Sequence, residues 1–367
     1  MNVVIIVGLL AMLCAYLESI GKLKYGLKIA FGIITVFAAI RYDFGNDYMG
    51  YLDGFNRYKN YHGSLFDIEA LIEMQGHGDY GWVFLNLIAS PIGFFNFVIL
   101  LSILENWIIY DFVKTYVPKK WYAMAIFIFV FNPNLMVLGC SMMRQWLAIC
   151  IFVFSFRFIR DRKPILYFIF IFIAISIHGS ARILLPFYFI TYLKGNSFSL
   201  KRLFWFVPLL VGWFVIAPHL LVDNLEWLFS LSDVEAFSIY DEGSTEQYGI
   251  LGIVAYFLFP IVCLSQIRRF DPDSRLLILL SFITIILWPF GLIISMILRL
   301  SFYFMIFSVV VYPMVMEKLQ KINTALVFVF LPIVIIPAVR DFFTFFQSPV
   351  WIEYFSQYHT IFSVSWQ

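Results

Sequence analysis

The chain has 367 residues, of which 62% are hydrophobic and only 13% are charged. A soluble globular protein is closer to half apolar and a quarter charged, so this composition excludes an ordinary soluble domain and predicts a polytopic membrane protein. The net charge is +2, and no basic run or basic–aromatic alternation indicates a nucleic-acid partner.

Apolar runs separated by short charged loops predict an all-α protein with about twelve transmembrane helices, forming a single integral membrane domain over residues 1–367. The first apolar run lacks a basic region and a cleavage site, so we interpret it as a retained helix. Segment 80–90 is too short to span, and we interpret it as an interfacial or re-entrant helix. The expected spans are 2–18, 27–40, 93–113, 121–138, 145–159, 164–178, 181–193, 203–221, 249–267, 275–294, 296–315 and 322–339.

The loop charges predict the orientation, because cytoplasmic loops of membrane proteins carry an excess of Lys and Arg. Alternate loops hold most of the 25 basic residues, so we place those loops in the cytoplasm and both termini outside. The outer side then carries two long acidic loops, 41–80 and 222–248, and an aromatic tail, 341–367.

The basic residues on the predicted outer side are mostly arginine, whereas the cytoplasmic loops are richer in lysine. Topology requires only charge, but planar bidentate recognition of phosphate or carboxylate requires guanidinium. Arg144, Arg182 and Arg299 are each expected at the outer N-terminus of a span, where the helix dipole also favours an anion. The sequence therefore predicts an anion-binding pocket. The outer basic residues are Arg41, Arg57, Lys59, Arg144, Arg182, Arg299 and Arg340.

Segment 41–48 leaves the second expected span, with Gly45 and Asn46 as turn residues. It places Asp43 and Asp47 near the membrane surface. A carboxylate beside a positive pocket stays ionised and can serve as a general base for a sugar hydroxyl, and Asp47 is the stronger candidate. The alternative is that both acids only pair with local arginines.

The turn 178–182, His-Gly-Ser-Ala-Arg, joins two short spans. A helix from Pro164 to His178 rises about 22 Å, against a hydrocarbon core of about 30 Å, so we expect this turn below the outer surface. Irregular backbone at that depth is tolerated only inside protein or beside a wet cavity, which makes His178 and Arg182 functional candidates. The alternative is a longer, tilted helix with His178 satisfied inside the bundle.

Arg299 and Tyr303 follow segment 288–291, whose Pro and Gly predict a kink toward a cavity. The alternative for every outer arginine is snorkelling to the interface. Glu105 lies in the middle of span 93–113 and can pair with an arginine of another helix, which the sequence does not identify.

Signatures of soluble enzymes, such as a Gly-rich phosphate loop or H-E-x-x-H, are missing from the sequence. The five histidines show no metal-ligand spacing, and the four cysteines lie in or beside apolar runs. We therefore predict free cysteines, no metal and no cofactor.

Four short motifs lie in order along most of the chain. They are Arg41 with Asn46-Asp47-Tyr48 and Tyr51, Gly81-Trp82-Val83-Phe84-Leu85-Asn86, Met143-Arg144-Gln145, and His178-Gly179-Ser180-Ala181. Together they resemble the EpsG-type family, one branch of the Wzy-like bacterial polysaccharide polymerases of O-antigen, capsule and exopolysaccharide synthesis. Arg299 with Tyr303 fits a weaker late motif.

The resemblance implies a bundle related to the GT-C membrane glycosyltransferases, in the bacterial inner (cytoplasmic) membrane, with the active site facing the periplasm. The outer side on which the loop charges place both termini is then the periplasm. It implies transfer of a glycan from undecaprenyl diphosphate to the non-reducing end of a lipid-linked repeat unit. The partners are then the lipid-linked donor and acceptor, the bilayer and, as a further candidate, a chain-length regulator.

For that reaction we expect Arg144, Arg182 and Arg299 to bind the diphosphate without a metal ion and to stabilise its developing charge. His178 can bind phosphate or transfer a proton, and Asp47 or His178 is the candidate base. The catalytic candidates are thus Asp47, His178 and Arg144, and the further substrate-binding candidates are Arg41, Asp43, Gln145, Arg182, Arg299 and Tyr303.

Other functions share some of these features. An O-antigen-ligase-like transferase would use the same arginines with a different acceptor. A transporter of lipid-linked oligosaccharide or polysaccharide would also carry outer arginines, but should place charges in the cytoplasmic half as well. An acyltransferase is disfavoured because His178 lacks a neighbouring acid or Asn in the sequence.

Overall fold

The computed structural model describes residues 1–59, 61, 79–194, 250–291 and 295–363. The structure is 81% helical, and the residues that it describes hold almost no strand, which confirms the predicted all-α class. The chain forms two compact units, one of residues 1–191 and 338–367 and the other of residues 192–337.

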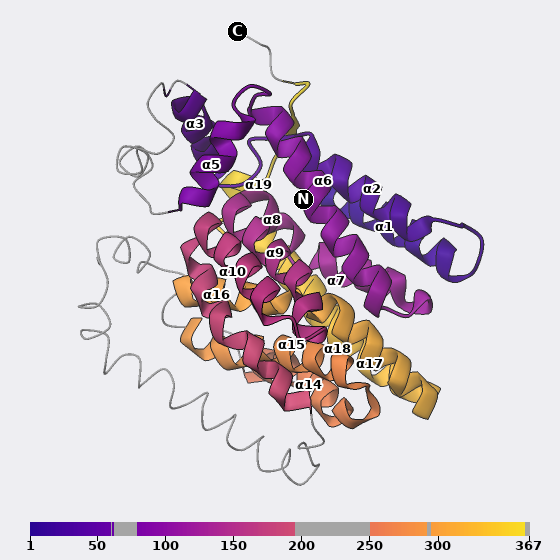
Figure 1. Ribbon diagram of the computed structural model, residues 1–367. Helices are drawn as coiled ribbons and strands as arrows, with labels where there is room; N and C mark the ends of the chain where they lie inside the picture. The colour runs from indigo at the N-terminus through magenta and orange to yellow at the C-terminus, as the bar shows by residue number, and fades with distance from the viewer. Residues whose placement is uncertain (60, 62–78, 195–249, 292–294, 364–367) are drawn as a thin grey trace. The chain divides into compact units, whose positions relative to one another are not determined.

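The first unit is built from helices of which some pack on their neighbours along the chain and others on helices further away in the sequence (Figure 1). Helix α1 packs against α2 and α7, α6 against α2 and α9, and α10 against α9 and α5. The elements are α1 (Asn2–Ser19), α2 (Gly26–Ala39), β1 (Arg41–Tyr42), α3 (Tyr48–Lys59), α5 (Tyr80–Ala89), α6 (Phe94–Tyr116), η1 (Lys119–Trp121), α7 (Tyr122–Phe131), α8 (Met136–Ser141), α9 (Met143–Arg160), α10 (Pro164–Ile177), most of η2 (Gly179–Lys194), α19 (Ile352–Phe355) and β2 (His359–Thr360).

The second unit holds α14, α15, α16 and α17, with α15 packed against each of the other three. Phe259 of α14 is buried there and packs edge to face on Tyr312 of α17, with ring centroids 4.8 Å apart. Its elements are α14 (Ile250–Ser265), η3 (Ile267–Arg269), α15 (Pro272–Gly291), α16 (Ser295–Met305), α17 (Ser308–Ile322) and the first part of α18 (Thr324–Gln347).

Three helices of the described chain, α1, α6 and α18, are long and apolar enough to cross a membrane, or up to four spans if α16 and α17 form one bent span. The protein is therefore an all-α membrane protein. The expected number of about twelve spans stays a prediction. The span at 203–221 and the loop at 222–248 lie outside the described residues.

Two expected spans are not continuous helices. Helix α7 ends at Phe131 and α8 begins at Met136, so span 121–138 is broken. Pro133 causes the break, because a residue before proline is driven out of the helical region, and Asn132 has φ −91° and ψ 106°. Span 296–315 is bent by 50° between α16 and α17, where neither proline nor glycine marks the bend.

The span expected at 181–193 is a 3-10 helix, η2. Pro186 lies inside it. Proline lacks an N–H group, and its ring clashes with the carbonyl four residues earlier in an α-helix, so it disfavours α-helical winding here. Tyr167 of α10 donates a hydrogen bond from its hydroxyl to the Leu184 carbonyl at 2.7 Å, which joins η2 to α10.

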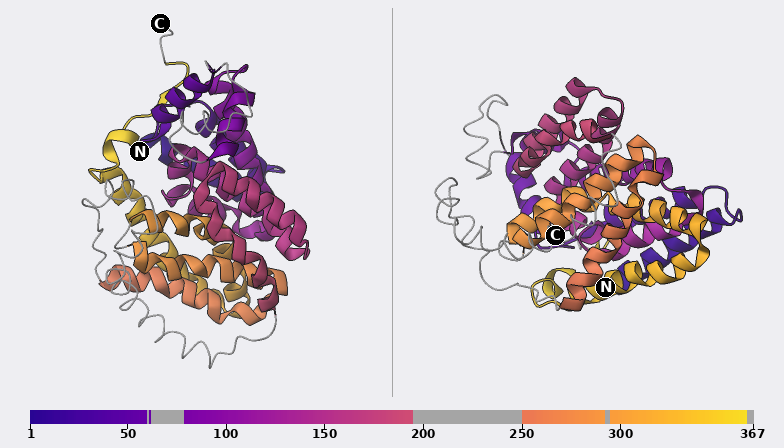
Figure 2. Two further views of the ribbon diagram at one scale, coloured as in Figure 1. Left: turned by 60° about the vertical axis from the view of Figure 1, so that its left-hand side comes forward. Right: turned by 90° about the horizontal axis from the view of Figure 1, so that it is seen from below.

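The C-terminal segment is packed onto the turn that follows α2. Strand β2 pairs antiparallel with β1, with Arg41 opposite Thr360 and Tyr42 opposite His359. Figure 2 shows the yellow C-terminal segment beside the purple helices of the first unit. The Gly45 N–H donates to the Tyr354 carbonyl at 3.1 Å. The tail expected at 341–367 therefore begins inside α18 and holds the 41–47 turn in place.

We expect Tyr358→Ala to destabilise the first unit by about 2 kcal/mol, because it removes a buried aromatic contact and a hydrogen bond. The Tyr358 ring stacks on Phe37 at 4.8 Å and its hydroxyl donates to the Phe37 carbonyl at 2.6 Å. The measurement is the thermal unfolding midpoint of the purified protein in detergent. Tyr354→Ala is the control, because that side chain is 42% exposed. Equal midpoints for both variants would contradict the prediction.

Candidate anion-binding site

Three segments of the first unit bring polar side chains together. Asp79 directly precedes α5, Arg144 is the second residue of α9, and His178 lies between α10 and η2. Helix α10 ends at Ile177 because His178 is extended, with φ −150° and ψ 114°. Each of the three side chains therefore lies at or beside a helix end.

Close packing of α5 on α10 brings Asp79 to this place. A Cβ atom added to Gly81 would collide with Ser176 Oγ and lie 2.9 Å from the Ser176 carbonyl carbon. Real Cβ contacts of that length do not occur, so only glycine lets the first turn of α5 approach α10 this closely. The predicted interfacial helix 80–90 is thus observed as α5, and its start is fixed beside His178.

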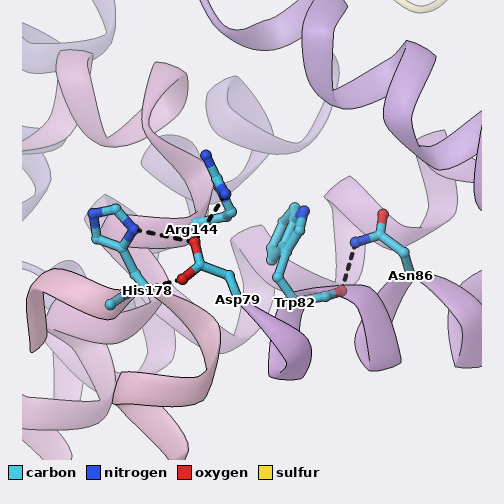
Figure 3. A network of polar contacts seen from close by, with 6 residues as sticks. Asp79, Trp82, Asn86, Arg144 and His178 are labelled. Atoms are coloured by element: carbon cyan, nitrogen blue, oxygen red, sulfur yellow. Dashed lines mark hydrogen bonds and ion pairs between the residues drawn. The ribbon is translucent and has the colours of Figure 1, made fainter. Parts of the chain in front are cut away.

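The Asp79 carboxylate accepts from two donors and faces a third group (Figure 3). Arg144 Nη1 lies 2.9 Å from Oδ2, and the Gly179 N–H donates to Oδ1 at 3.0 Å. His178 Nδ1 lies 3.6 Å from Oδ2, slightly beyond hydrogen-bond length. One carboxylate thus joins the N-termini of α9 and η2.

The site is mostly buried, and its charges are coupled. The exposed fractions of the side chains are 11% for Asp79, 19% for Arg144 and 26% for His178. Burial alone would raise the pKa of the Asp79 carboxyl, but His178, Arg144 and the Gly179 N–H outweigh burial and lower the pKa below its ordinary value. Asp79 is therefore an anion at neutral pH.

Two buried donors of the site are not used by the described residues. Arg144 Nε and His178 Nδ1 make no hydrogen bond to any described group. The Arg144 guanidinium lies 5.7 Å from the centre of the Tyr51 ring, and the Tyr51 ring packs against Trp82 at 5.4 Å. A buried guanidinium with an unused donor can accept a further ligand with oxygen atoms.

Arg182 lies beside this network, on the first turn of η2. A Cβ atom added to Gly179 would be 3.3 Å from Arg182 Nη1 and 3.6 Å from Asp79 Oδ1, so both groups border the same small space. The Arg182 side chain is exposed. The structure thus places Arg144, His178 and Arg182 close together, and their role in anion binding stays a prediction.

Asp47 belongs to a neighbouring turn. Ser141 Oγ donates to Asn46 Oδ1 at 2.7 Å, the Asp47 N–H donates to Ser141 Oγ at 3.3 Å, and Asn46 Nδ2 donates to Asp47 Oδ1 at 2.9 Å. The Asp47 charge acts on both Tyr51 and Arg144. Asp47 therefore lies within electrostatic range of the anion site.

Arg41 is placed in a separate, buried network. It is 3% exposed, and its guanidinium donates to the Cys140 carbonyl at 3.1 Å, to Ser102 Oγ at 3.2 Å and to the Ala38 carbonyl. Glu105 is 6% exposed and lines a cavity of about 10 Å³ together with Arg41. Arg41 is therefore the arginine that shares a cavity with this acid, which the sequence did not identify. These contacts hold α2, α6 and α8 together.

The remaining candidates lie at other places. Asp43 is exposed on the turn, with φ +48°. Gln145 is buried in α9, at 3% exposure. Arg299 and the fully buried Tyr303 belong to α16 of the second unit. Their expected roles in substrate binding stay predictions.

Asp79 is the group that sequence reasoning missed. The sequence placed it only among the acids of loop 41–80. The available signal was its position directly before the first apolar residue of α5, where an acid complements the helix N-terminus. The prediction that His178 lacks an acidic neighbour is wrong, because the fold brings Asp79 beside it from far earlier in the chain.

Among the described residues, no group of three or more His, Cys, Asp or Glu side chains is arranged to hold a metal ion. The EpsG family model matches residues 24–359, which is nearly the whole chain. No curated protein and no solved structure matches the chain.

Proposed function

The chain belongs to the EpsG family of polysaccharide polymerase-like membrane proteins, and we propose that it is a polysaccharide repeat-unit polymerase. In this proposal the protein is a GT-C-like glycosyltransferase of the bacterial inner membrane. It transfers glycan from undecaprenyl diphosphate to the non-reducing end of a lipid-linked repeat unit, on the periplasmic face.

The observation that carries the proposal is the convergence of Arg144, Arg182, His178 and the Gly179 N–H on one small site. Such donors suit a ligand with several anionic oxygens. In the proposed reaction the bond between the donor sugar and its diphosphate breaks, and the electron pair goes to the diphosphate oxygen. Arginines preorganised in a partly buried site stabilise that charge more than water does.

The acceptor supplies a hydroxyl oxygen, which bonds to the anomeric carbon of the donor, and its proton must go to a base. Asp47 and His178 are the bases expected from the sequence, and both lie near Arg144 in the fold. The released product is undecaprenyl diphosphate. An acid beside His178 is also compatible with acyl transfer. The family assignment supports polymer synthesis instead.

We expect purified wild-type protein to convert the lipid-linked repeat unit of its own cell into a ladder of longer lipid-linked glycans. The measurement is gel separation of the glycans after incubation in detergent or in vesicles, with a known polymerase on its own substrate as the active control. A ladder supports the proposal. An unlengthened repeat unit beside an active control contradicts it, and movement of that unit across vesicles without lengthening indicates a transporter.

A further inference from the structure

Asp79 occupies a site whose donors suit a larger anion. Its carboxylate is held by Arg144 from α9 and by the Gly179 N–H from η2. A carboxylate offers two oxygens, whereas a diphosphate offers more and can span both helix N-termini. The groups already aimed at Asp79 are thus the groups that the proposed diphosphate would need.

The site also retains unused capacity. Arg144 Nε is buried and makes no hydrogen bond to the described residues, although Nη1 is held by Asp79. His178 Nδ1 is buried and equally without a hydrogen bond there. A single carboxylate in its present place therefore leaves two buried nitrogen atoms without a hydrogen bond, and a ligand with more oxygen atoms could reach both.

A diphosphate and Asp79 cannot share Arg144 without cost. Two negative charges at one guanidinium repel each other, and a partly buried site screens that repulsion less than water does. The repulsion falls if Asp79 moves away from the guanidinium or takes up a proton. The titratable and charged groups around the pair are His178, Arg182, Tyr51 and Asp47.

We propose that Asp79 is a resting occupant of the diphosphate site and becomes the general base when the diphosphate takes Arg144. This inference rests on the proposed function. The acceptor hydroxyl then bonds to the anomeric carbon while its proton passes to an Asp79 carboxylate oxygen, directly or through His178. The sugar–diphosphate bond breaks and its electron pair leaves on the diphosphate, so atoms and charges balance.

Exchange of partners explains how one carboxylate fills both roles. While Arg144 and Gly179 hold Asp79, its pKa is below the ordinary value and it is a weak base. Replacing the cation at its side with the negative diphosphate raises its affinity for a proton. The base is thereby activated only when a donor is bound.

The test compares binding and transfer in Asp79→Asn, which keeps the shape of the side chain and an acceptor for the Gly179 N–H. The probe for binding is undecaprenyl diphosphate. The affinity for undecaprenol, which lacks the diphosphate, is measured in parallel and gives the contribution of the lipid tail. We expect the variant to bind the diphosphate at least threefold more tightly than wild type. We expect its initial rate of glycan lengthening to fall about 100-fold, the usual contribution of a general base.

Asp111→Asn is the matched control, because Asp111 also pairs with an arginine, Arg157 at 3.4 Å, at the other end of α6 and α9. It should change neither quantity. Weaker diphosphate binding by Asp79→Asn would overturn the proposal, because Asp79 would then only position Arg144. Retained transfer would overturn it as well.

A second variant, Asp79→Ser, is tested in case Asp79→Asn does not fold. Folding of each variant is checked by size-exclusion chromatography in detergent, where each should elute as a single species. If neither folds, Asp79 is a structural partner and the proposal is overturned. The proposed function fails separately, when wild type itself neither binds undecaprenyl diphosphate nor lengthens the glycan. If wild type does both but the Asp79 variants bind the diphosphate more weakly or keep the rate of lengthening, only the proposed role of Asp79 is overturned.

Discussion

Replacing Arg144 with alanine is expected to collapse the cellular glycan to a single repeat unit. The substitution removes the guanidinium that pairs with Asp79 at 2.9 Å and lies beside the Tyr51 ring. Losing one preorganised donor to a developing anion usually lowers the rate about 100- to 1000-fold. The measurement is glycan length on gels, with the membrane level of the protein checked in parallel.

Arg157→Ala is the matched control for that experiment. Arg157 lies on the same helix and also pairs with an aspartate, yet its side chain is 39% exposed and is expected on the cytoplasmic side. It should leave full-length polymer. Full-length polymer in Arg144→Ala would mean that this arginine is only an interfacial anchor, and loss of even the single unit would indicate an earlier step such as transport.

Gly45→Ala is expected to abolish most polymer and to destabilise the first unit by about 2 kcal/mol or more. Gly45 has φ +114°, which L side chains rarely adopt. An added Cβ atom would lie 2.5 Å from Ser141 Cβ and 2.9 Å from Ser141 Cα. The turn would have to leave Ser141, and Asp47 would lose its present place near Arg144.

The control for this glycine lies five residues further along the chain. Gly50 is inside α3, and a Cβ atom added there meets nothing within 4 Å. Gly50→Ala should raise the thermal unfolding midpoint slightly, since alanine is favoured over glycine in a helix by about 1 kcal/mol. Opposite shifts for the two variants in one thermal assay are the expected result. Equal shifts would show that the turn is not strained by a side chain.

The sequence predicted the helical class and several boundaries because apolar runs and proline or charge at their ends are local signals. Helix α10 begins at Pro164 as expected, and α9 starts one residue before Arg144. The Asn132-Pro133 break was also a local signal, but a count of apolar residues over 121–138 averages across it. The bend between α16 and α17 lies at residues without proline or glycine, so no such local signal marks it.

The candidate site was only partly predictable for a different reason. Arg144, His178 and Arg182 could be grouped because topology placed them on one side of the membrane. Asp79 could not be selected from the acids of its loop, since its role depends on Gly81 packing on Ser176. Arg41 lies in a buried network with the Cys140 carbonyl and Ser102 Oγ that the sequence did not indicate, and its expected role in substrate binding stays a prediction. Long-range contacts of this kind leave no periodic pattern.

The winding of η2 sets how far its residues reach. At about 2.0 Å per residue, a 3-10 helix of this length extends roughly 32 Å, whereas an α-helix would extend roughly 24 Å. The stretch Gly179–Lys194 is thus roughly as long as a hydrocarbon core is thick, although it holds only 16 residues. Rewinding it as an α-helix would shorten it by roughly 8 Å, so its winding sets how far Arg182 and the anion site lie from the other end of η2.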